Sequence, residues 1–201
     1  MTDAVKIRPA APLVLWRTGA LGPEVLMGQR GATAAFMPSK FVFPGGAVEA
    51  GDRVRTDHLT TICAARLAED VPPEAPLPDQ IAAAALRELA EETGLRLQDA
   101  APLRFIFRAI TPPGSPRRYD ARFLMGSAEA LLGDPDDFAA AEDELAALQW
   151  VPLQRARSFD LPFITEIVLS EVAALIAGAD QPGVPFFDNR GPGSCFSRLH
   201  G

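Results

Sequence analysis

The chain has 201 residues, enough for one compact domain with a sizeable core and too few for two. Apolar residues make up 48%, which argues against global disorder. The 26 acidic side chains outnumber the 19 basic ones and give a net charge of -7. This balance disfavours a nucleic-acid-binding protein, because such a protein needs a basic surface to neutralise phosphates.

Several sequence features bear on where in the cell the protein works. Cys63 and Cys195 stand far apart and outside any Cys-x-x-Cys pair, which is typical of a reducing environment. With only His58 and His200 beside them, a structural zinc site is not expected. Residues 1–11 lack the apolar stretch of a secretory signal, and no apolar run approaches the roughly 20 residues that span a bilayer. We therefore expect a cytoplasmic protein that does not enter a membrane.

Three short apolar segments near the N-terminus predict strands at residues 12–17, 24–30 and 41–43. Glycines and a proline separate the first two segments, as in a hairpin. The third segment ends abruptly at residues 44–46, Pro-Gly-Gly. A proline followed by two glycines ends a strand and lets the backbone come close to a ligand.

A proline-rich stretch then separates two helical patterns. Residues 59–67 predict a short helix, and the prolines at positions 72, 73, 76 and 78 prevent regular structure after it. Residues 80–93 predict a longer helix, with Asp79 as its N-cap and Gly94 just past its end.

The remaining residues predict strands at 103–110 and 119–125, a short helix or a loop at 136–148, and an amphipathic helix at 163–177. The tail, residues 180–201, is rich in glycine and proline and is expected to be irregular. Strands, a helix, more strands and a final helix predict an α/β sandwich with a mixed sheet. We expect residues 1–201 to form a single domain.

Within the helix expected at residues 80–93, Glu88, Glu91 and Glu92 fall at positions i, i+3 and i+4 and share one face. Arg87 lies one turn before Glu91 and can pair with it. Three neighbouring carboxylates repel one another, so the stripe is unfavourable unless a cation occupies it, and carboxylate oxygens suit Mg²⁺ or Mn²⁺. Taken alone, three such glutamates more often form a solvated acidic face.

Two segments together change that interpretation, because they resemble the box of the Nudix (MutT-like) hydrolases. This box reads G-x5-E-x7-R-E-U-x-E-E-x-G-U, where U is a bulky apolar residue. Residues 43–46, Phe-Pro-Gly-Gly, are typical of its entry, and residues 87–95 match its second half at every fixed position. The resemblance implies a Nudix-type α/β/α sandwich with a mixed sheet.

The box departs from the family pattern in two ways. Asp52 stands where the family has glutamate, and residues 53–86 separate it from the second half, where the family has seven residues. We assign the extra length to an insertion at residues 53–79, because a surface loop can lengthen at modest entropic cost. Such an interrupted box resembles a subgroup related to peroxisomal-type coenzyme A diphosphatases, to which residues 111–112 and 117–123 are also similar.

The resemblance implies a divalent-metal-dependent hydrolase that cuts the diphosphate linkage of a nucleoside diphosphate derivative, with coenzyme A or an acyl-CoA among the candidates. Glu88, Glu91 and Glu92 would bind Mg²⁺ or Mn²⁺, and Glu88 would also count as catalytic. Arg87 would assist catalysis by orienting the glutamates through salt bridges rather than by touching the substrate.

Further positions are candidates for binding and proton transfer. Gly45 and Gly46 would bring the backbone against metal and phosphates. Glu144 is a candidate general base on a later loop, although a helix glutamate can also serve as base and Glu144 can also be an N-terminal helix residue. Arg118 and Arg122 share a strand face and could hold a phosphate, or they could be solvated.

Two rival interpretations remain open. A non-catalytic Nudix-fold sensor or interaction module would bind a nucleotide without cutting it, but such proteins tend to lose the box glutamates, and three are present here. A structural domain with an incidental acidic helix is the other. The expected partner is a small-molecule diphosphate, and family analogy suggests a homodimer.

Overall fold

The computed structural model describes residues 5–52, 57–191 and 193–201. Its main sheet contains β1 (Ile7–Ala10), β2 (Leu13–Gly19), β3 (Gly22–Arg30), β4 (Phe41–Val42), β6 (Arg104–Ile110), β7 (Arg118–Ser127), β9 (Leu145–Pro152), β10 (Val184–Asp188) and β11 (Cys195–Leu199). The strand order is β11-β10-β6-β7-β2-β3-β4, with β1 added beside β7 and β9 beside β3. The other elements are α1 (Thr61–Ala68), α2 (Pro78–Thr93), β5 (Arg96–Leu97), a 3-10 turn (Ala128–Ala130), β8 (Leu131–Leu132), α3 (Leu153–Ala156) and α4 (Phe163–Ile176).

The sheet is mixed, as the sequence predicts. Strands β1 and β2 both run parallel to β7, and β10 runs parallel to β6. The remaining pairs in this sheet are antiparallel. Strands β5 and β8 form a separate two-stranded sheet.

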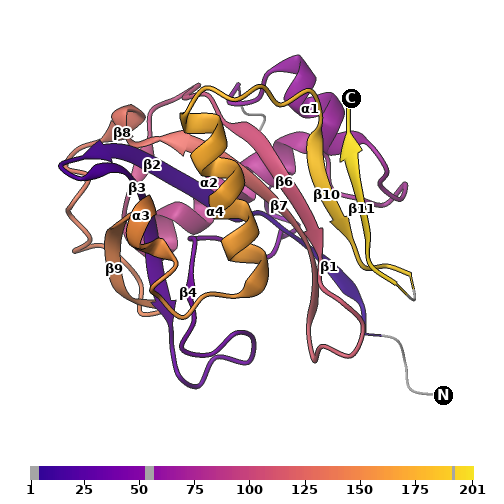
Figure 1. Ribbon diagram of the computed structural model, residues 1–201, viewed down its shortest axis with the longest axis horizontal. Coiled ribbons are helices and arrows are strands. Elements are labelled where there is room, and N and C mark those ends of the chain that lie inside the picture. Colours follow the sequence, from indigo (N-terminus) through magenta and orange to yellow (C-terminus); the bar gives the residue numbers. More distant parts are fainter. Residues whose placement is uncertain (1–4, 53–56, 192) are drawn as a thin grey trace.

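Helices cover both faces of the sheet (Figure 1), with α4 on one face and α1 and α2 on the other. Ile81 and Leu89 of α2 pack in one buried cluster with Leu13 of β2. Val168 of α4 packs in a second cluster with Phe107 of β6. Each face of the sheet therefore buries its own apolar side chains, which confirms the expected α/β/α sandwich.

Helix α2 begins earlier than the sequence pattern predicts. Its first residue is Pro78 and its N-cap is Leu77, so the assignment of Asp79 as N-cap is wrong. Proline fits the first helical position because no hydrogen bond is required of its nitrogen there. The Leu77 amide donates instead to Gln80 Oε1 at 2.9 Å. At the other end, Gly94 has φ of 76° and ends the helix as expected.

The insertion contains a helix, as the sequence predicts. The helix expected at residues 59–67 is confirmed as α1, whose N-cap hydroxyl on Thr60 accepts from the Cys63 amide. Residues 53–56 of the insertion lie outside the described part of the chain.

The expectation of an irregular tail at residues 180–201 is wrong, because β10 and β11 form an antiparallel hairpin there. Their side chains complete the core, since Val184, Phe186 and Leu199 are buried in the cluster beneath α1 and α2. No helix among the described residues is long and apolar enough to cross a membrane.

Candidate active site

The Pro-Gly-Gly turn runs along the start of β2 and passes beneath α2. The Leu13 amide donates to Pro44 O at 2.8 Å, and the Ala11 amide donates to Gly46 O at 2.9 Å. Gly45 has φ of +148°, and a Cβ atom there would overlap the backbone of Pro12. A Cβ atom on Gly46 would overlap the Glu88 carboxylate. The two glycines therefore let the turn lie between the sheet and the glutamates of α2.

The three glutamates of α2 lie in different environments. Glu92 is buried, with 2% of its surface exposed, and its Oε2 accepts a 2.7 Å hydrogen bond from the Gly45 amide. Glu88 is also buried, whereas the side chain of Glu91 is 44% exposed. Burial raises the pKa of Glu92 to about 8; the Gly45 amide opposes this shift, and the charges of Glu88 and Glu144 add to it. Burial likewise raises the pKa of Glu88, against the effect of Arg87.

Arg87 joins the helix glutamates to Asp52. Its Nη1 donates to Glu88 Oε1 and to Glu91 Oε2, both at 2.8 Å. Its Nε and Nη2 donate to the two oxygens of Asp52 at 2.9 and 3.2 Å, and Nη2 also reaches Ala47 O at 3.1 Å. Hydrogen bonding to Asp52, then to Glu88 and Glu91, raises the pKa of Arg87 despite its burial. The guanidinium thus fixes the directions of three carboxylates at once.

Asp52 contacts Arg87 in this arrangement. Both of its oxygens accept from Arg87, and Oδ2 also accepts from the Glu49 amide at 2.7 Å. Burial alone would raise the pKa of Asp52, but the bonds from Arg87 and from the Glu49 amide lower it overall. Although aspartate is one methylene shorter than the family's glutamate, it reaches the arginine directly.

Glu144 approaches the same centre from the loop before β9. Its charge raises the pKa of both Glu88 and Glu92, so it lies within electrostatic range of these helix glutamates. Its Oε1 accepts from Arg30 Nη2 at 3.2 Å, and its side chain is 57% exposed. Glu144 precedes a strand rather than a helix. Arg30 is a member of the cluster that the sequence pattern did not reveal, because a single arginine at a strand end forms no motif.

Arg118 and Arg122 lie on β7 and make other contacts. Arg118 donates to the backbone oxygens of Thr111 and Asn189 at 2.9 and 2.7 Å. Arg122 is 1% exposed and donates through Nη2 to Asp120 at 2.7 Å. Within the described residues, neither arginine bonds to the carboxylate cluster, and Nε and Nη1 of Arg122 have no partner. The fold thus does not bring these two arginines together with the helix glutamates.

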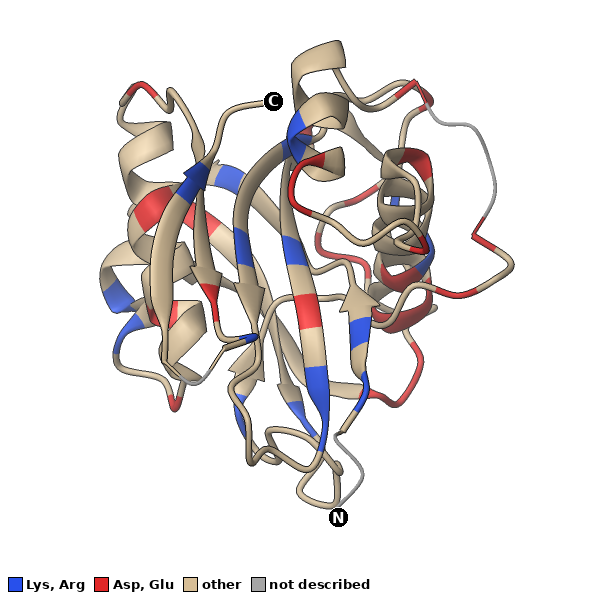
Figure 2. Ribbon diagram, turned by 90° about the vertical axis from the view of Figure 1, so that its right-hand side faces the viewer, with Lys and Arg blue, Asp and Glu red and all other residues tan. Residues whose placement is uncertain are grey.

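The donor chemistry of the cluster fits a hard divalent cation. The described residues contain no ready-made group of three or more metal-ligating side chains. However, Glu88 and Glu91 each use one oxygen to accept from Arg87, and Glu92 uses one to accept from Gly45. Each carboxylate keeps a second oxygen, and Mg²⁺ and Mn²⁺ prefer such ligands. Figure 2 shows acidic segments gathered around α2, whereas basic residues lie mainly along the strands.

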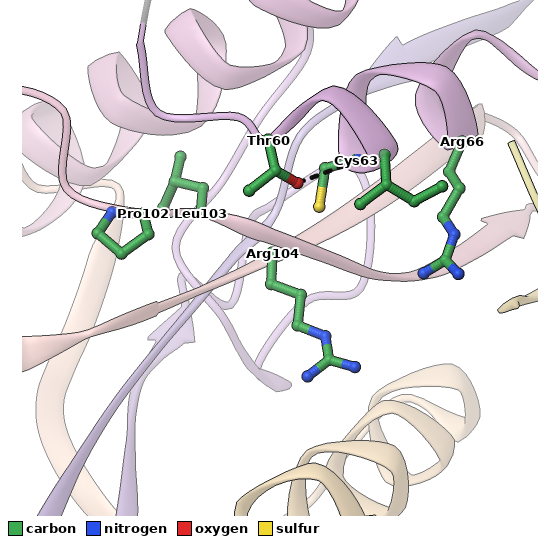
Figure 3. Close-up of a pocket in the computed structure, with 7 residues that line it drawn as sticks. Thr60, Cys63, Arg66, Pro102, Leu103 and Arg104 are labelled. Atoms are coloured by element: carbon green, nitrogen blue, oxygen red, sulfur yellow. Dashed lines mark hydrogen bonds between the residues drawn. The ribbon is translucent and has the colours of Figure 1, made fainter. Parts of the chain in front are cut away.

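A separate cavity of about 280 Å³ lies between α1 and the start of β6 (Figure 3). It is lined by Thr60, Ile62, Cys63, Arg66, Pro102, Leu103 and Arg104. The Thr60 hydroxyl is occupied by the Cys63 amide, and Arg66 donates to backbone oxygens of the C-terminal segment. None of the α2 carboxylates lines this cavity.

Comparison with known proteins agrees with this geometry. The family model of the NUDIX domain matches residues 72–169. A NUDIX hydrolase from Alicyclobacillus acidocaldarius, known from a crystal structure, is 30% identical; the match covers 86% of this chain and 96% of that chain, with a TM-score of 0.64. The chain therefore belongs to the Nudix family. More particularly, it is a Nudix hydrolase, an enzyme of the pyrophosphohydrolase class.

More distant structures share the fold. An Ap4A hydrolase from C. elegans, solved as a binary complex, is 19% identical over 86% of this chain and 99% of that chain, with a TM-score of 0.53. The NUDIX domain of Shewanella oneidensis NrtR, solved with ADP ribose, is 13% identical over 85% of this chain and 89% of that chain, with a TM-score of 0.52. No curated protein matches the chain in sequence.

Proposed function

We propose that this enzyme hydrolyses the diphosphate linkage of a nucleoside diphosphate derivative with the help of Mg²⁺ or Mn²⁺. The observation that carries the proposal is the buried Glu92 carboxylate, held at the Gly45 amide beside Glu88 and Glu91. A carboxylate with so high a pKa is costly to ionise, and a divalent cation would offset that cost. Nudix hydrolases generally use divalent metals, which supports the same assignment.

The chain's own residues divide the work. Glu88, Glu91 and Glu92 would hold the metal, which supplies neutralisation of the diphosphate oxygens and activation of water. Arg87 holds Glu88 and Glu91 through hydrogen bonds, which would limit how far these two carboxylates must move to bind a metal. Glu144, whose Oε1 accepts from Arg30, is our candidate general base and would accept a proton from the attacking water.

We further propose which diphosphate compound is the substrate. The interrupted box supports coenzyme A or an acyl-CoA as substrate. The similar folds of an Ap4A hydrolase and of a NUDIX domain bound to ADP ribose make dinucleoside polyphosphates and ADP-ribose necessary comparisons. Phosphate binding by the backbone at Gly45 and Gly46 and by the side chains of Arg118 and Arg122 stays a prediction. So do the cytoplasmic location, the homodimer and the absence of nucleic-acid and membrane partners.

The first test is metal-dependent cleavage of a panel of diphosphates. Coenzyme A, ADP-ribose and diadenosine tetraphosphate would be incubated with Mg²⁺, with Mn²⁺ or with chelator, and products identified by mass spectrometry. We expect cleavage at the diphosphate with metal and none with chelator. Glu91→Gln and Glu92→Gln should each lower kcat/KM by about 100-fold or more, because each removes a charged ligand.

Glu166→Gln is the matched control for these variants, because Glu166 is exposed on α4, on the opposite face of the sheet. It should leave kcat/KM unchanged. Binding of a diphosphate by the wild-type protein without cleavage of any compound would overturn the proposal and favour a sensor.

A further inference from the structure

Arg30, the last residue of β3, pairs with a glutamate of the acidic site and has a donor group without a partner in the described part of the chain. Its Nη2 bonds to Glu144 at 3.2 Å, and its charge acts on Glu92. Its Nε is buried and has no hydrogen-bond partner within the described part of the chain. A guanidinium carries five donors, and a buried donor without a partner destabilises the state that contains it. The side chain as a whole is 20% exposed, so atoms of it other than Nε are accessible to a ligand.

The backbone of Arg30 is held firmly on the sheet. The Arg30 amide donates to Lys40 O at 2.9 Å, and Arg30 O accepts from the Ser39 amide at 3.1 Å. On its other side Arg30 pairs with Leu145 of β9. Its partner Glu144 lies outside the strand and is more exposed. In the Arg30–Glu144 pair, the arginine therefore has its backbone held on the sheet, whereas the glutamate lies outside the strand and is the more exposed member.

The charges in the cluster determine which side chain is suited to bind a diphosphate. The carboxylates of Glu88, Glu91 and Glu144 would repel a diphosphate, and Arg87 already donates to Asp52, to two of these glutamates and to Ala47 O. Arg30 is thus the cation of the cluster whose donors are not all used. Arginine binds phosphate oxygens in the same fork geometry with which it binds carboxylates.

We propose that Arg30 binds the diphosphate of the substrate and that Glu144 occupies Arg30 until the substrate arrives. The phosphate oxygens take the place of Glu144 Oε1 on the guanidinium, and the displaced carboxylate becomes available for proton transfer. This inference rests on the proposed function, since it assumes a diphosphate substrate. It adds a substrate-binding residue to the site and couples substrate arrival to the release of Glu144.

The direct test measures anion binding without turnover. Binding of ADP to the full chain in the presence of chelator would be followed by calorimetry for the wild type, Arg30→Ala, Arg30→Lys and Arg104→Ala. We expect Arg30→Ala to weaken binding by about 10- to 100-fold and Arg30→Lys by less, because a charged hydrogen bond is lost in one and partly kept in the other. Arg104→Ala removes the same charge from an exposed side chain outside the cluster and should bind like the wild type.

The placeholder role of Glu144 has its own test. Glu144→Gln should tighten ADP binding in chelator, because the amide releases Arg30, while Asp143→Asn removes a neighbouring exposed charge that does not pair with Arg30. The gain from Glu144→Gln should exceed that from Asp143→Asn by at least about threefold and should disappear when Arg30 is also alanine. Equal gains from both variants, or a gain that persists without Arg30, would overturn the placeholder role.

Turnover separates failure of this inference from failure of the proposed function. If the wild type cleaves a diphosphate, Arg30→Ala should raise KM more than it lowers kcat, and Arg30→Lys should recover part of the loss. Cleavage by the wild type with unchanged KM and unchanged ADP binding in Arg30→Ala would refute the inference and leave the proposed function intact. Thermal unfolding of each variant, compared with the wild type, identifies any that fail to fold; Arg30→Lys then carries the test.

Discussion

Gly45 and Gly46 are adjacent in sequence but are constrained by different atoms. At Gly45 a side chain would meet the backbone of Pro12, and the φ of +148° is itself unfavourable for other residues. At Gly46 a side chain would meet the end of the flexible Glu88 side chain. The first glycine is therefore required by the fold and the second by the position of a carboxylate.

Gly46→Ala should consequently impair activity with little effect on stability. We expect kcat/KM to fall by about 100-fold, because displacement of a reacting group by about 1 Å can cost that much, while the free energy of unfolding in urea changes by less than about 1 kcal/mol. Gly45→Ala should instead destabilise the protein by about 2 kcal/mol or more. Equal stability losses in the two variants would contradict this division.

The raised pKa of Glu92 makes stability depend on pH. The folded protein keeps a proton on Glu92 up to about pH 8, whereas the unfolded chain releases it near 4.5. The stabilising effect of that proton is therefore complete below pH 4.5 and is lost as the pH rises towards 8. In chelator, the unfolding temperature of Glu92→Gln should exceed that of the wild type at pH 8 but not at pH 4.5.

Metal addition provides the complementary measurement for Glu92. Saturating Mg²⁺ at pH 8 should raise the unfolding temperature of the wild type, because the ion binds only the folded state. The gain should be smaller in Glu92→Gln. A gain of the same size in the variant would show that Glu92 is not a ligand.

At the scale of whole elements, α1 is docked on the C-terminal hairpin. Arg66 donates to Pro182 O at 3.0 Å and to His200 O at 3.3 Å. Glu69 accepts from the His200 and Gly201 amides at 2.6 and 2.7 Å. Helix α1, which lies within the box insertion, and the hairpin therefore support each other, although they are far apart in the chain.

Arg66→Ala should loosen both elements together. We expect a loss of about 1 kcal/mol, typical of a few partly exposed hydrogen bonds, and faster amide hydrogen exchange in both α1 and β11. Arg104→Ala, at the same cavity, should change neither. Faster exchange in α1 alone would show that the two elements open independently.

The elements that the sequence predicted well are those specified by local patterns. The stripe of glutamates, the end of α2 at Gly94 and α1 all follow from spacings of a few residues. The hairpin of β10 and β11 was missed because its stability depends on β6, whose Arg108 and Ala109 lie opposite Phe186 and Phe187. Glycines and prolines around so short an apolar run predict a coil unless that distant partner is known.

In the candidate site too, contacts between residues close in the sequence were predicted and contacts between distant residues were not. The contact of Arg87 with Glu91 follows from helical spacing, and it is present at 2.8 Å. The pair of Arg30 and Glu144 spans 114 residues, and no periodicity connects its members. Arg122 shows the converse problem, because alternation along β7 did not predict its burial beside Asp120.

At the scale of the whole molecule, the core beneath α1 and α2 depends on the last strands. Phe186 is 1% exposed and packs against Arg108, whose guanidinium lies 4.4 Å from the ring centroid. Phe186→Ala should lower the free energy of unfolding by about 3 to 5 kcal/mol in urea titrations, the range for a buried phenylalanine. Phe196→Ala, at a residue that is 58% exposed, should cost less than about 1 kcal/mol. Similar losses in the two variants would contradict this account of the core.

The parallel pairing of β10 with β6 also bears on how the chain folds as it is synthesised. Strand β6 and the glutamates of α2 leave the ribosome well before residues 184–199, and until those residues follow, one edge of β6 has no neighbour. An unpaired strand edge invites association with other chains. Nascent chains that stop before Val184 should therefore be the ones most prone to aggregate and most dependent on chaperones, even though they already contain the complete set of box residues.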